Sequence, residues 1–218
     1  DGGGATFTIH LPAHDAAVLR AYGETHHDRI AALLVEPMAN RIGLLLPERA
    51  FLEEARALCD RYGIVLVFDE VIAFRVGYHG AQGLLGITPD LTTLGKIIGG
   101  GFPVGAVAGR ADILALSTPD RALRVTHAGT FNGNPTMAVA GRATMEVLTP
   151  AVFDQLAALG QYARDGLARI AAGLPLQVTG AGSLFKVTAT ARTLHDYRDA
   201  ATSDKRWEAL ASLALLNE

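Results

Sequence analysis

Four short apolar runs stand out in the first half of the chain, separated by polar and glycine-rich segments. They cover residues 30–35, 64–68, 91–94 and 104–108. Runs of this length between turn-forming residues are typical of strands buried inside a sheet. Amphipathic stretches accompany them at residues 14–22 and 47–62, with a short one near Ala81. The alternation of strand and helix predicts an α/β fold whose sheet is mostly parallel and is covered on both faces.

The pattern changes after Pro150. Residues 135–148 and 151–172 have helical periodicity, residues 176–190 alternate as strands do, and residues 194–216 are helical again. We therefore expect a boundary near Pro150, with residues 1–150 forming part of a large domain and residues 151–218 part of a smaller α+β domain.

Composition and charge narrow the function classes. Half of the 218 residues are hydrophobic and 19% are charged, which is typical of a globular core. The net charge of −3 gives no indication of a nucleic-acid partner. No run approaches the roughly 18 apolar residues that a membrane span needs. The single cysteine, Cys59, excludes an internal disulfide framework and fits a reduced, cytoplasmic setting.

Three polar clusters lie where the predicted strands and helices end or begin. Asp69 directly follows the run at residues 64–68, and Lys96 follows the run at 91–94 within LGKIIGGG (94–101). Gly129 and Thr130 open the stretch GTFNGNP (129–135), which precedes a predicted helix. Because ligands of parallel sheets bind beyond the carboxyl ends of the strands, Asp69 and Lys96 are expected to face one site.

Each cluster has an ordinary structural explanation, as a helix cap, a surface lysine or a turn. Together they meet the needs of one cofactor. A pyridine cofactor that stabilises carbanions needs a carboxylate beside its ring nitrogen, for which Asp69 is suited. Its aldehyde needs an amine for a Schiff base, which Lys96 supplies. Its phosphate needs backbone N–H groups and a hydroxyl near a helix start, which Gly129 and Thr130 can provide.

A nucleotide-binding site shares part of this pattern. Four apolar residues followed by Asp69 and Glu70 also describe the Walker B strand of a P-loop ATPase. That class needs G-x-x-x-x-G-K-[ST], whereas Asp90 stands in place of the first glycine and Ile97 in place of the hydroxyl residue. The lysine loop also follows the acidic strand instead of preceding it, so the ATPase interpretation is weak.

The sequence resembles class III aminotransferases, and within them the glutamate-1-semialdehyde aminomutase branch. The matching stretches are VEPMAN (35–40), FDEV (68–71), FRVGYHGAQ (74–82), PDLTTLGKIIGGGFPVGAVAGR (89–110) and AGTFNGNP (128–135). The resemblance implies a fold-type-I transferase that depends on pyridoxal 5'-phosphate and acts on a small amino substrate. It also implies a homodimer with the active site at the subunit interface.

The same resemblance assigns roles to individual residues. Lys96 would form the Schiff base with the cofactor, Asp69 would pair with the pyridine nitrogen, and Val71 would pack on the ring. Thr130, next to Gly129, would bind the phosphate, which in this family is usually that of the neighbouring subunit. These roles describe an enzyme that transfers an amino group on an amino acid or amino-aldehyde, as a transaminase or an aminomutase.

Departures from the family pattern leave alternatives open. The usual D-E-V-x-T-G-F-R stretch is one residue shorter here (DEVIAFR, 69–75), and Arg41 stands near a position where ω-amino-acid transaminases carry glutamate. The family's phosphate-binding Gly-Ser/Thr loop has no counterpart, and the last helix reaches Glu218 without a terminating glycine or proline. A non-catalytic fragment of such an enzyme, and a racemase or lyase of the same fold, stay open. We expect these residues alone to aggregate, because a hydrophobic edge would be uncovered.

Other polar residues receive no catalytic role. His26, His27 and Asp28 are adjacent and would point in different directions, so no metal site is predicted. Cys59, between apolar helix positions, is expected to be packed and inert. Glu36 follows a predicted strand and Gln82 lies within HGAQ (79–82), and each either touches the ligand or makes hydrogen bonds within its loop.

Overall fold

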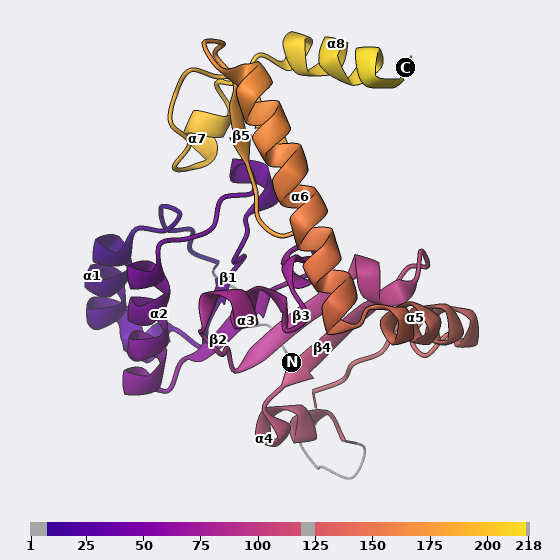
Figure 1. Cartoon of the computed structure of the whole chain (residues 1–218). Coiled ribbons are helices and arrows are strands. Elements are labelled where there is room, and N and C mark those ends of the chain that lie inside the picture. Colours follow the sequence, from indigo (N-terminus) through magenta and orange to yellow (C-terminus); the bar gives the residue numbers. More distant parts are fainter. Residues whose placement is uncertain (1–7, 119–124, 217–218) are drawn as a thin grey trace.

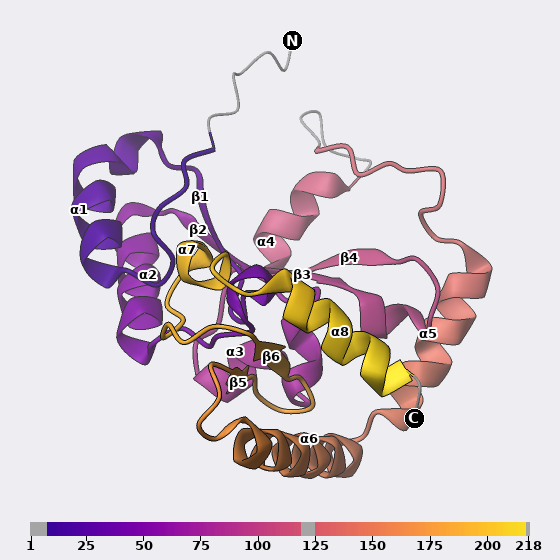
Figure 2. The ribbon, with the colours of Figure 1, turned by 90° about the horizontal axis from the view of Figure 1, so that it is seen from above.

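The computed structural model describes residues 8–118 and 125–216. Figure 1 shows helices around a four-stranded sheet, from which the long helix α6 leads to a second, two-stranded sheet. Helices α1 and α2 lie side by side at one end of this body and α5 lies at the other end, an arrangement that Figure 2 repeats from above. Within the described part of the chain, no helix is both long and apolar enough to cross a membrane.

The main sheet has three parallel strands and one antiparallel edge strand. In spatial order it contains β1 (Ala32–Val35), β2 (Val65–Asp69), β3 (Leu91–Gly95) and β4 (Gly105–Gly109). β1, β2 and β3 are parallel, and β4 is antiparallel to β3. β4 is antiparallel because residues 96–104, which connect it to β3, are too few for a parallel crossover, which needs about a dozen residues or more. The predicted α/β fold with a mostly parallel sheet is confirmed.

The second sheet pairs two short strands, β5 (Gln177–Thr179) and β6 (Lys186–Thr188), in antiparallel fashion. The helices are α1 (Ala16–His26), α2 (Arg49–Tyr62), α3 (Gly80–Leu85), α4 (Ala111–Leu114), α5 (Pro135–Val147), α6 (Pro150–Ala171), α7 (Tyr197–Ala200) and α8 (Lys205–Leu216). The short 3-10 turns are η1 (His27–Arg29), η2 (Asn40–Ile42), η3 (Ala73–Val76), η4 (Lys96–Gly99) and η5 (Ala115–Ser117).

The largest core lies between α2 and the main sheet. Leu52, Ala55 and Leu58 line one face of α2 and pack against Leu66 and Phe68 of β2. All five are buried, and full burial of a Leu or Phe side chain contributes about 1.5–3 kcal/mol. This core fixes β2, and with it the position of the residues that follow the strand.

Ion pairs to the buried carboxylate of Asp90 fix the beginning of β3. Asp90 accepts hydrogen bonds from the Leu66 backbone N–H (2.8 Å), from Arg110 (3.0 Å) and from Arg56 (3.0 Å). Burial by itself opposes ionisation of Asp90, but these donors outweigh it and hold the pKa of the carboxyl below its usual value. The start of β3 is thereby tied to β2 and α2, at the end of the strand opposite to Lys96.

The expectation that the sheet is covered on both faces is wrong for the described residues. Leu33 and Val35 of β1 pack into the core with α1 and α2, whereas Leu34, on the other face, is 64% exposed. Four of the five β4 residues are also exposed. The two helices that accompany β1 cover one face only, because alternate strand residues point to opposite sides.

The expectation of continuous helix over residues 194–216 is also wrong. The chain forms the short α7 and then the separate helix α8. Asp204 ends the connection between them, since its Oδ1 accepts hydrogen bonds from the backbone N–H groups of Arg206 and Trp207, both at 3.0 Å. An aspartate that caps the next helix competes with continuation of the previous one.

The later part of the chain packs on the earlier part at η3. Gly182 lies so close to Val76 that a Cβ atom at this glycine would come within 2.5 Å of the Val76 carbonyl oxygen. The rings of Tyr78 and Phe153 meet edge to face, with centroids 6.0 Å apart. The domain boundary near Pro150 stays a prediction, but residues from both sides of it surround the turn that follows β2.

Candidate active site

Asp69 is the last residue of β2, and one of its carboxylate oxygens is held in place. Its Oδ1 accepts hydrogen bonds from the Val71 backbone N–H and from Thr93 Oγ1 on β3, each at 3.1 Å. Asp69 and Thr93 are also register partners in the two parallel strands. The other oxygen, Oδ2, has no hydrogen-bond donor among the described residues, so it is available to a ligand.

Lys96 follows β3 directly and has a left-handed backbone, with a φ of 50°. A residue with a side chain adopts this conformation at a cost of about 1–2 kcal/mol, and such strain is often found at functional sites. The ammonium group has neither an ion pair nor a hydrogen bond within the described part of the chain. The structure therefore holds a strained and unpaired lysine next to the carboxyl ends of β2 and β3.

Glycines allow α5 to support the lysine turn closely. A Cβ at Gly141 of α5 would lie 2.4 Å from the Ile98 carbonyl oxygen, and one at Gly100 would lie 2.4 Å from the Ala140 carbonyl oxygen. Val71 packs closely on Gly95 in the same way, because a Cβ at Gly95 would lie 3.3 Å from Val71 Cγ1. The helix after the GTFNGNP stretch thus fixes η4, the turn that begins with Lys96.

Lys96 and Val71 line one open cavity of about 1010 Å³. The complete lining is Val71, Ile72, Arg75, Lys96, Ile97, Gly101, Phe102, Pro103, Val104 and Leu184. Asp69 precedes Val71 by two residues but is not itself part of the lining. The structure therefore brings the predicted lysine and ring-packing residue together, with the predicted carboxylate at the neighbouring strand end.

Gly129 and Thr130 lie elsewhere, in an exposed turn before α5. The Gly129 carbonyl accepts a hydrogen bond from Asn132 N (3.0 Å), and Asn134 caps α5 by accepting from Thr136 N (2.9 Å). The turn-and-cap explanation thus accounts for part of this stretch. Neither residue lines the cavity with Lys96, so their role in phosphate binding stays a prediction.

The sequence reasoning gave no role to Glu70, which is completely buried beside Asp69. Its carboxylate accepts hydrogen bonds from the backbone N–H groups of Ala81 (2.7 Å) and Gln82 (3.0 Å) and from Gln82 Nε2 (3.2 Å). Gln82 Nε2 also donates to Thr92 Oγ1 on β3 (3.3 Å). Burial raises the pKa of the Glu70 carboxyl, and the hydrogen bonds oppose this only in part.

This network ties β2, β3 and α3 together just behind the candidate site. It also settles the position of Gln82, which binds Glu70 and does not line the cavity with Lys96. The sequence offered a weak signal, an acid directly after a predicted buried strand, but such an acid can equally be a helix cap or a loop residue. The groups that bind the Glu70 carboxylate belong to α3, and spacing could not identify them.

The remaining candidates have structural roles. Glu36 accepts a hydrogen bond from Asn40 N (3.0 Å) within its loop. His26 and His27 stack on Tyr22 and Tyr62, and the described residues contain no cluster of metal-ligating side chains. Cys59 is buried, and desolvation raises the pKa of its thiol to about 11, so the prediction that it is packed is confirmed.

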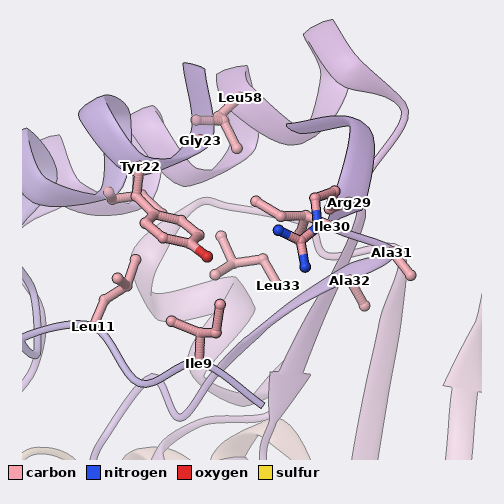
Figure 3. A pocket seen from close by; sticks show the side chains of 11 residues that line it. Ile9, Leu11, Tyr22, Gly23, Arg29, Ile30, Ala31, Ala32, Leu33 and Leu58 are labelled. Carbon is pink, nitrogen blue, oxygen red and sulfur yellow. The ribbon is translucent and has the colours of Figure 1, made fainter. Parts of the chain in front are cut away.

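A second cavity, of about 320 Å³, lies between α1 and β1. Figure 3 shows Tyr22, Arg29 and Ile30 around it, together with Ile9 and Leu33. Its lining is mostly aliphatic, and it shares no residue with the cavity at Lys96. It has no nucleophile with an adjacent base, so the Lys96 cavity is the better candidate for a reaction.

The chain is similar to proteins of known type over most of its length. The family model "Aminotransferase class-III" matches residues 9–206. A glutamate-1-semialdehyde 2,1-aminomutase from Citrifermentans bemidjiense is 40% identical over 218 residues, which are 98% of this chain and 51% of that protein. The chain therefore spans about half the length of the curated relatives it matches.

Solved structures agree with this match. An omega-transaminase from Sphaerobacter thermophilus is 48% identical with a TM-score of 0.84, over 89% of this chain and 45% of that one. A transaminase with PLP bound is 37% identical with a TM-score of 0.79, over 87% of this chain and 46% of that one. By sequence and by fold, the chain belongs to the class III aminotransferase family.

Proposed function

We propose that the protein containing this chain is a pyridoxal-phosphate enzyme that transfers an amino group on an amino acid or amino-aldehyde, with Lys96 as its catalytic residue. The observation that carries this proposal is that a carboxylate and an amine lie at two adjacent strand ends, those of β2 and β3. Asp69 ends β2 with one free carboxylate oxygen, and Lys96 follows the adjacent β3 with an unpaired amine in a strained backbone. The family match supports the same reaction class.

The chemistry of the residues fits this cofactor. Val71 offers a branched apolar surface on the cavity wall, and Asp69 offers a carboxylate next to it. Lys96 offers the primary amine that an aldehyde needs. When bound, pyridoxal phosphate supplies an electron sink for the carbanion formed at the substrate carbon.

Each of these side chains has a distinct task in the proposed reaction. Asp69 holds a proton at the ring nitrogen, because its negative charge favours the protonated form of a neighbouring base. Lys96 would hold the cofactor through its aldehyde and would move a proton to and from the substrate carbon. Gly129 and Thr130 bind the phosphate across the interface of a homodimer. We place the enzyme in the cytoplasm, where Cys59 stays reduced.

Lys96 gives the most direct test. The full-length protein with cofactor should absorb at about 420 nm, and borohydride reduction should attach the cofactor covalently to the peptide that contains Lys96. Lys96→Ala should lose both the band and the attachment. Lys205→Ala is the matched control, because this exposed lysine only pairs with Glu208 on α8. A reducible band that persists in Lys96→Ala would refute the assignment.

A second experiment separates the two reactions left open. An aminomutase converts glutamate 1-semialdehyde without any other substrate, whereas a transaminase needs an added amino donor or acceptor. The similarity to an aminomutase favours the first outcome, and the similarity to an omega-transaminase favours the second. Product formation from glutamate 1-semialdehyde alone, in the absence of a 2-oxo acid, would identify an aminomutase.

A further inference from the structure

The cavity at Lys96 contains two cationic side chains, Lys96 and Arg75, and its other lining residues are apolar or glycine. If the proposed function holds, the Lys96 amine is engaged by the cofactor. Arg75 is then the one permanent positive charge on the described lining of the cavity. It follows Asp69 by six residues and lies in η3, the turn that continues from the end of β2.

Arg75 differs from the other partly buried arginines in the partners of its guanidinium group. Within the described ranges, three arginines are partly buried, namely Arg56, Arg75 and Arg164. Arg56 is paired with Asp90, and Arg164 donates to the carbonyl oxygens of the 182–184 segment. Arg75 has no carboxylate within ion-pair distance in the described chain. Holding a partly buried cation without a counter-charge costs free energy, which an anionic ligand would recover.

One hydrogen bond, made by the Nε atom, orients the Arg75 guanidinium. Arg75 Nε donates to Ser183 Oγ at 3.3 Å, and the Ser183 hydroxyl lies 3.5 Å from the Arg75 carbonyl oxygen. The two Nη groups have no acceptor among the described residues. Two parallel N–H donors on a fixed plane match the two oxygens of a carboxylate. The close packing of Gly182 on Val76 keeps Ser183 in place.

We infer that Arg75 binds the carboxylate of the substrate, so that the enzyme prefers amino carboxylates with an apolar group to simple amines. This inference rests on the proposed function. Ile72, Phe102 and Leu184 form apolar walls of the same cavity and would contact the apolar group. Arg75 is thus a residue that determines specificity, while the chemical step belongs to Lys96.

The test uses a substrate pair that differs by the carboxylate alone. The full-length protein is assayed with 3-amino-3-phenylpropanoate and with 1-phenylethylamine, its decarboxylated counterpart. Arg75→Gln should lower kcat/KM for the amino acid by about 10- to 100-fold, because a charged hydrogen bond is lost. The same substitution should change kcat/KM for the amine by less than about 3-fold. Arg75→Lys should retain part of the preference, because it keeps the charge but not the fork.

Ser183→Ala is the matched control. It removes the tether of Arg75 but keeps the guanidinium, so the preference for the amino acid should fall by less than in Arg75→Gln. Equal losses for both substrates in Arg75→Gln, or a loss for neither, would overturn the inference. Thermal unfolding of each variant shows whether a loss of activity reflects misfolding. If Arg75→Gln is misfolded, the substrate preference of Arg75→Lys, which keeps the charge, decides between these outcomes.

A binding measurement separates this inference from the proposed function. Calorimetry with 3-phenylpropanoate, which has a carboxylate and no amine, should show binding that Arg75→Gln weakens by about 10-fold or more. Binding of 3-phenylpropan-1-ol should be the same in both proteins. Arg75-dependent binding without turnover of any amino substrate would refute the proposed function, and with it the claim that the bound carboxylate is that of a substrate. Turnover together with Arg75-independent binding would keep the proposed function and overturn the inference.

Discussion

The two side chains assigned to the chemistry differ in how firmly the protein holds them. Asp69 has one oxygen fixed by Val71 N and Thr93 Oγ1, while its second oxygen has no donor within the described chain. Lys96 is exposed and has no ion pair with the residues that the structure describes, and its backbone lies in the left-handed region. At the scale of residues the site therefore combines a positioned carboxylate with an exposed amine.

Asp69→Asn tests the role of the carboxylate. The amide oxygen can accept the same two hydrogen bonds, so we expect the fold to persist. Loss of the negative charge should lower kcat by about 30- to 1000-fold, equivalent to about 2–4 kcal/mol. The measurement is turnover at saturating cofactor, with Asp112→Asn as the control, since Asp112 is an exposed partner of Arg110. Activity within a few-fold of the wild type would mean that Asp69 does not face the cofactor.

Among the elements, α3 depends on a single buried acid. Glu70 accepts hydrogen bonds from two backbone N–H groups in the first turn of α3 and, through Gln82, is linked to β3. Gly80, at a φ of 69°, permits this approach, because a Cβ there would lie 2.2 Å from Glu70 Oε2. The strands that carry Asp69 and Lys96 are thus joined by a helix of six residues.

Glu70→Gln should change how stability depends on pH. Because the pKa of Glu70 is raised in the folded protein, the folded state binds this proton more tightly than the unfolded state. The stability that the proton contributes is complete below the ordinary pKa of 4.5 and is lost as pH rises through the folded pKa. The free energy of unfolding of the wild type should therefore decrease relative to Glu70→Gln between about pH 4.5 and neutrality.

Urea unfolding at several pH values measures this difference. Glu53→Gln is the control, because Glu53 is half exposed and, among the described residues, pairs with Arg49 alone, on the same helix. A constant difference between wild type and Glu70→Gln over this range would show that Glu70 does not titrate as its burial implies.

Taken as a whole, the described surface carries many large apolar side chains. Leu34 on β1 is 64% exposed, Val139 and Val147 on α5 are 70% and 66% exposed, and Tyr162 and Ile170 on α6 are 76% and 72% exposed. Where such side chains lie together, they mark a surface that packs against other protein. The homodimer proposed for this family would cover some of them.

We expect the 218-residue polypeptide alone to self-associate and to bind pyridoxal phosphate poorly, whereas the longer protein should be a soluble dimer. Sedimentation velocity and cofactor absorbance of both forms test this. Val139→Lys, on the outer face of α5, should reduce self-association of the short form, whereas Arg142→Lys, at an exposed position of the same helix, should not. A monodisperse, cofactor-loaded short form would show that the prediction is wrong.

Local patterns were sufficient to predict most elements of this fold. The apolar runs identified β1 to β4 within a residue or two, and Pro135 and Pro150 marked the starts of α5 and α6. The position of Asp69 and Lys96 at the ends of two strands was also predicted from the sequence, because each follows a predicted strand of a mostly parallel sheet. These features depend on residues close in the chain, which is why spacing reveals them.

The predictions that failed concern features that depend on contacts between distant segments of the chain. Residues 194–216 have one helical pattern, but capping by Asp204 and packing against the second sheet divide them. The exposed face of β1 could not be recognised either, since an apolar run has the same pattern whether one face or both are covered.

The sequence alone determined the family, the order of strands and helices along the chain, and a lysine and a carboxylate at the ends of two strands, which the structure shows to be neighbours. Only the tertiary structure decided the neighbours of that site. Glu70 meets Gln82 because α3 folds back on β2, and Arg75 meets Ser183, which is 108 residues away, because the later part of the chain packs on η3. Such pairs leave no periodic signal, since each depends on how two separately predictable segments are brought together.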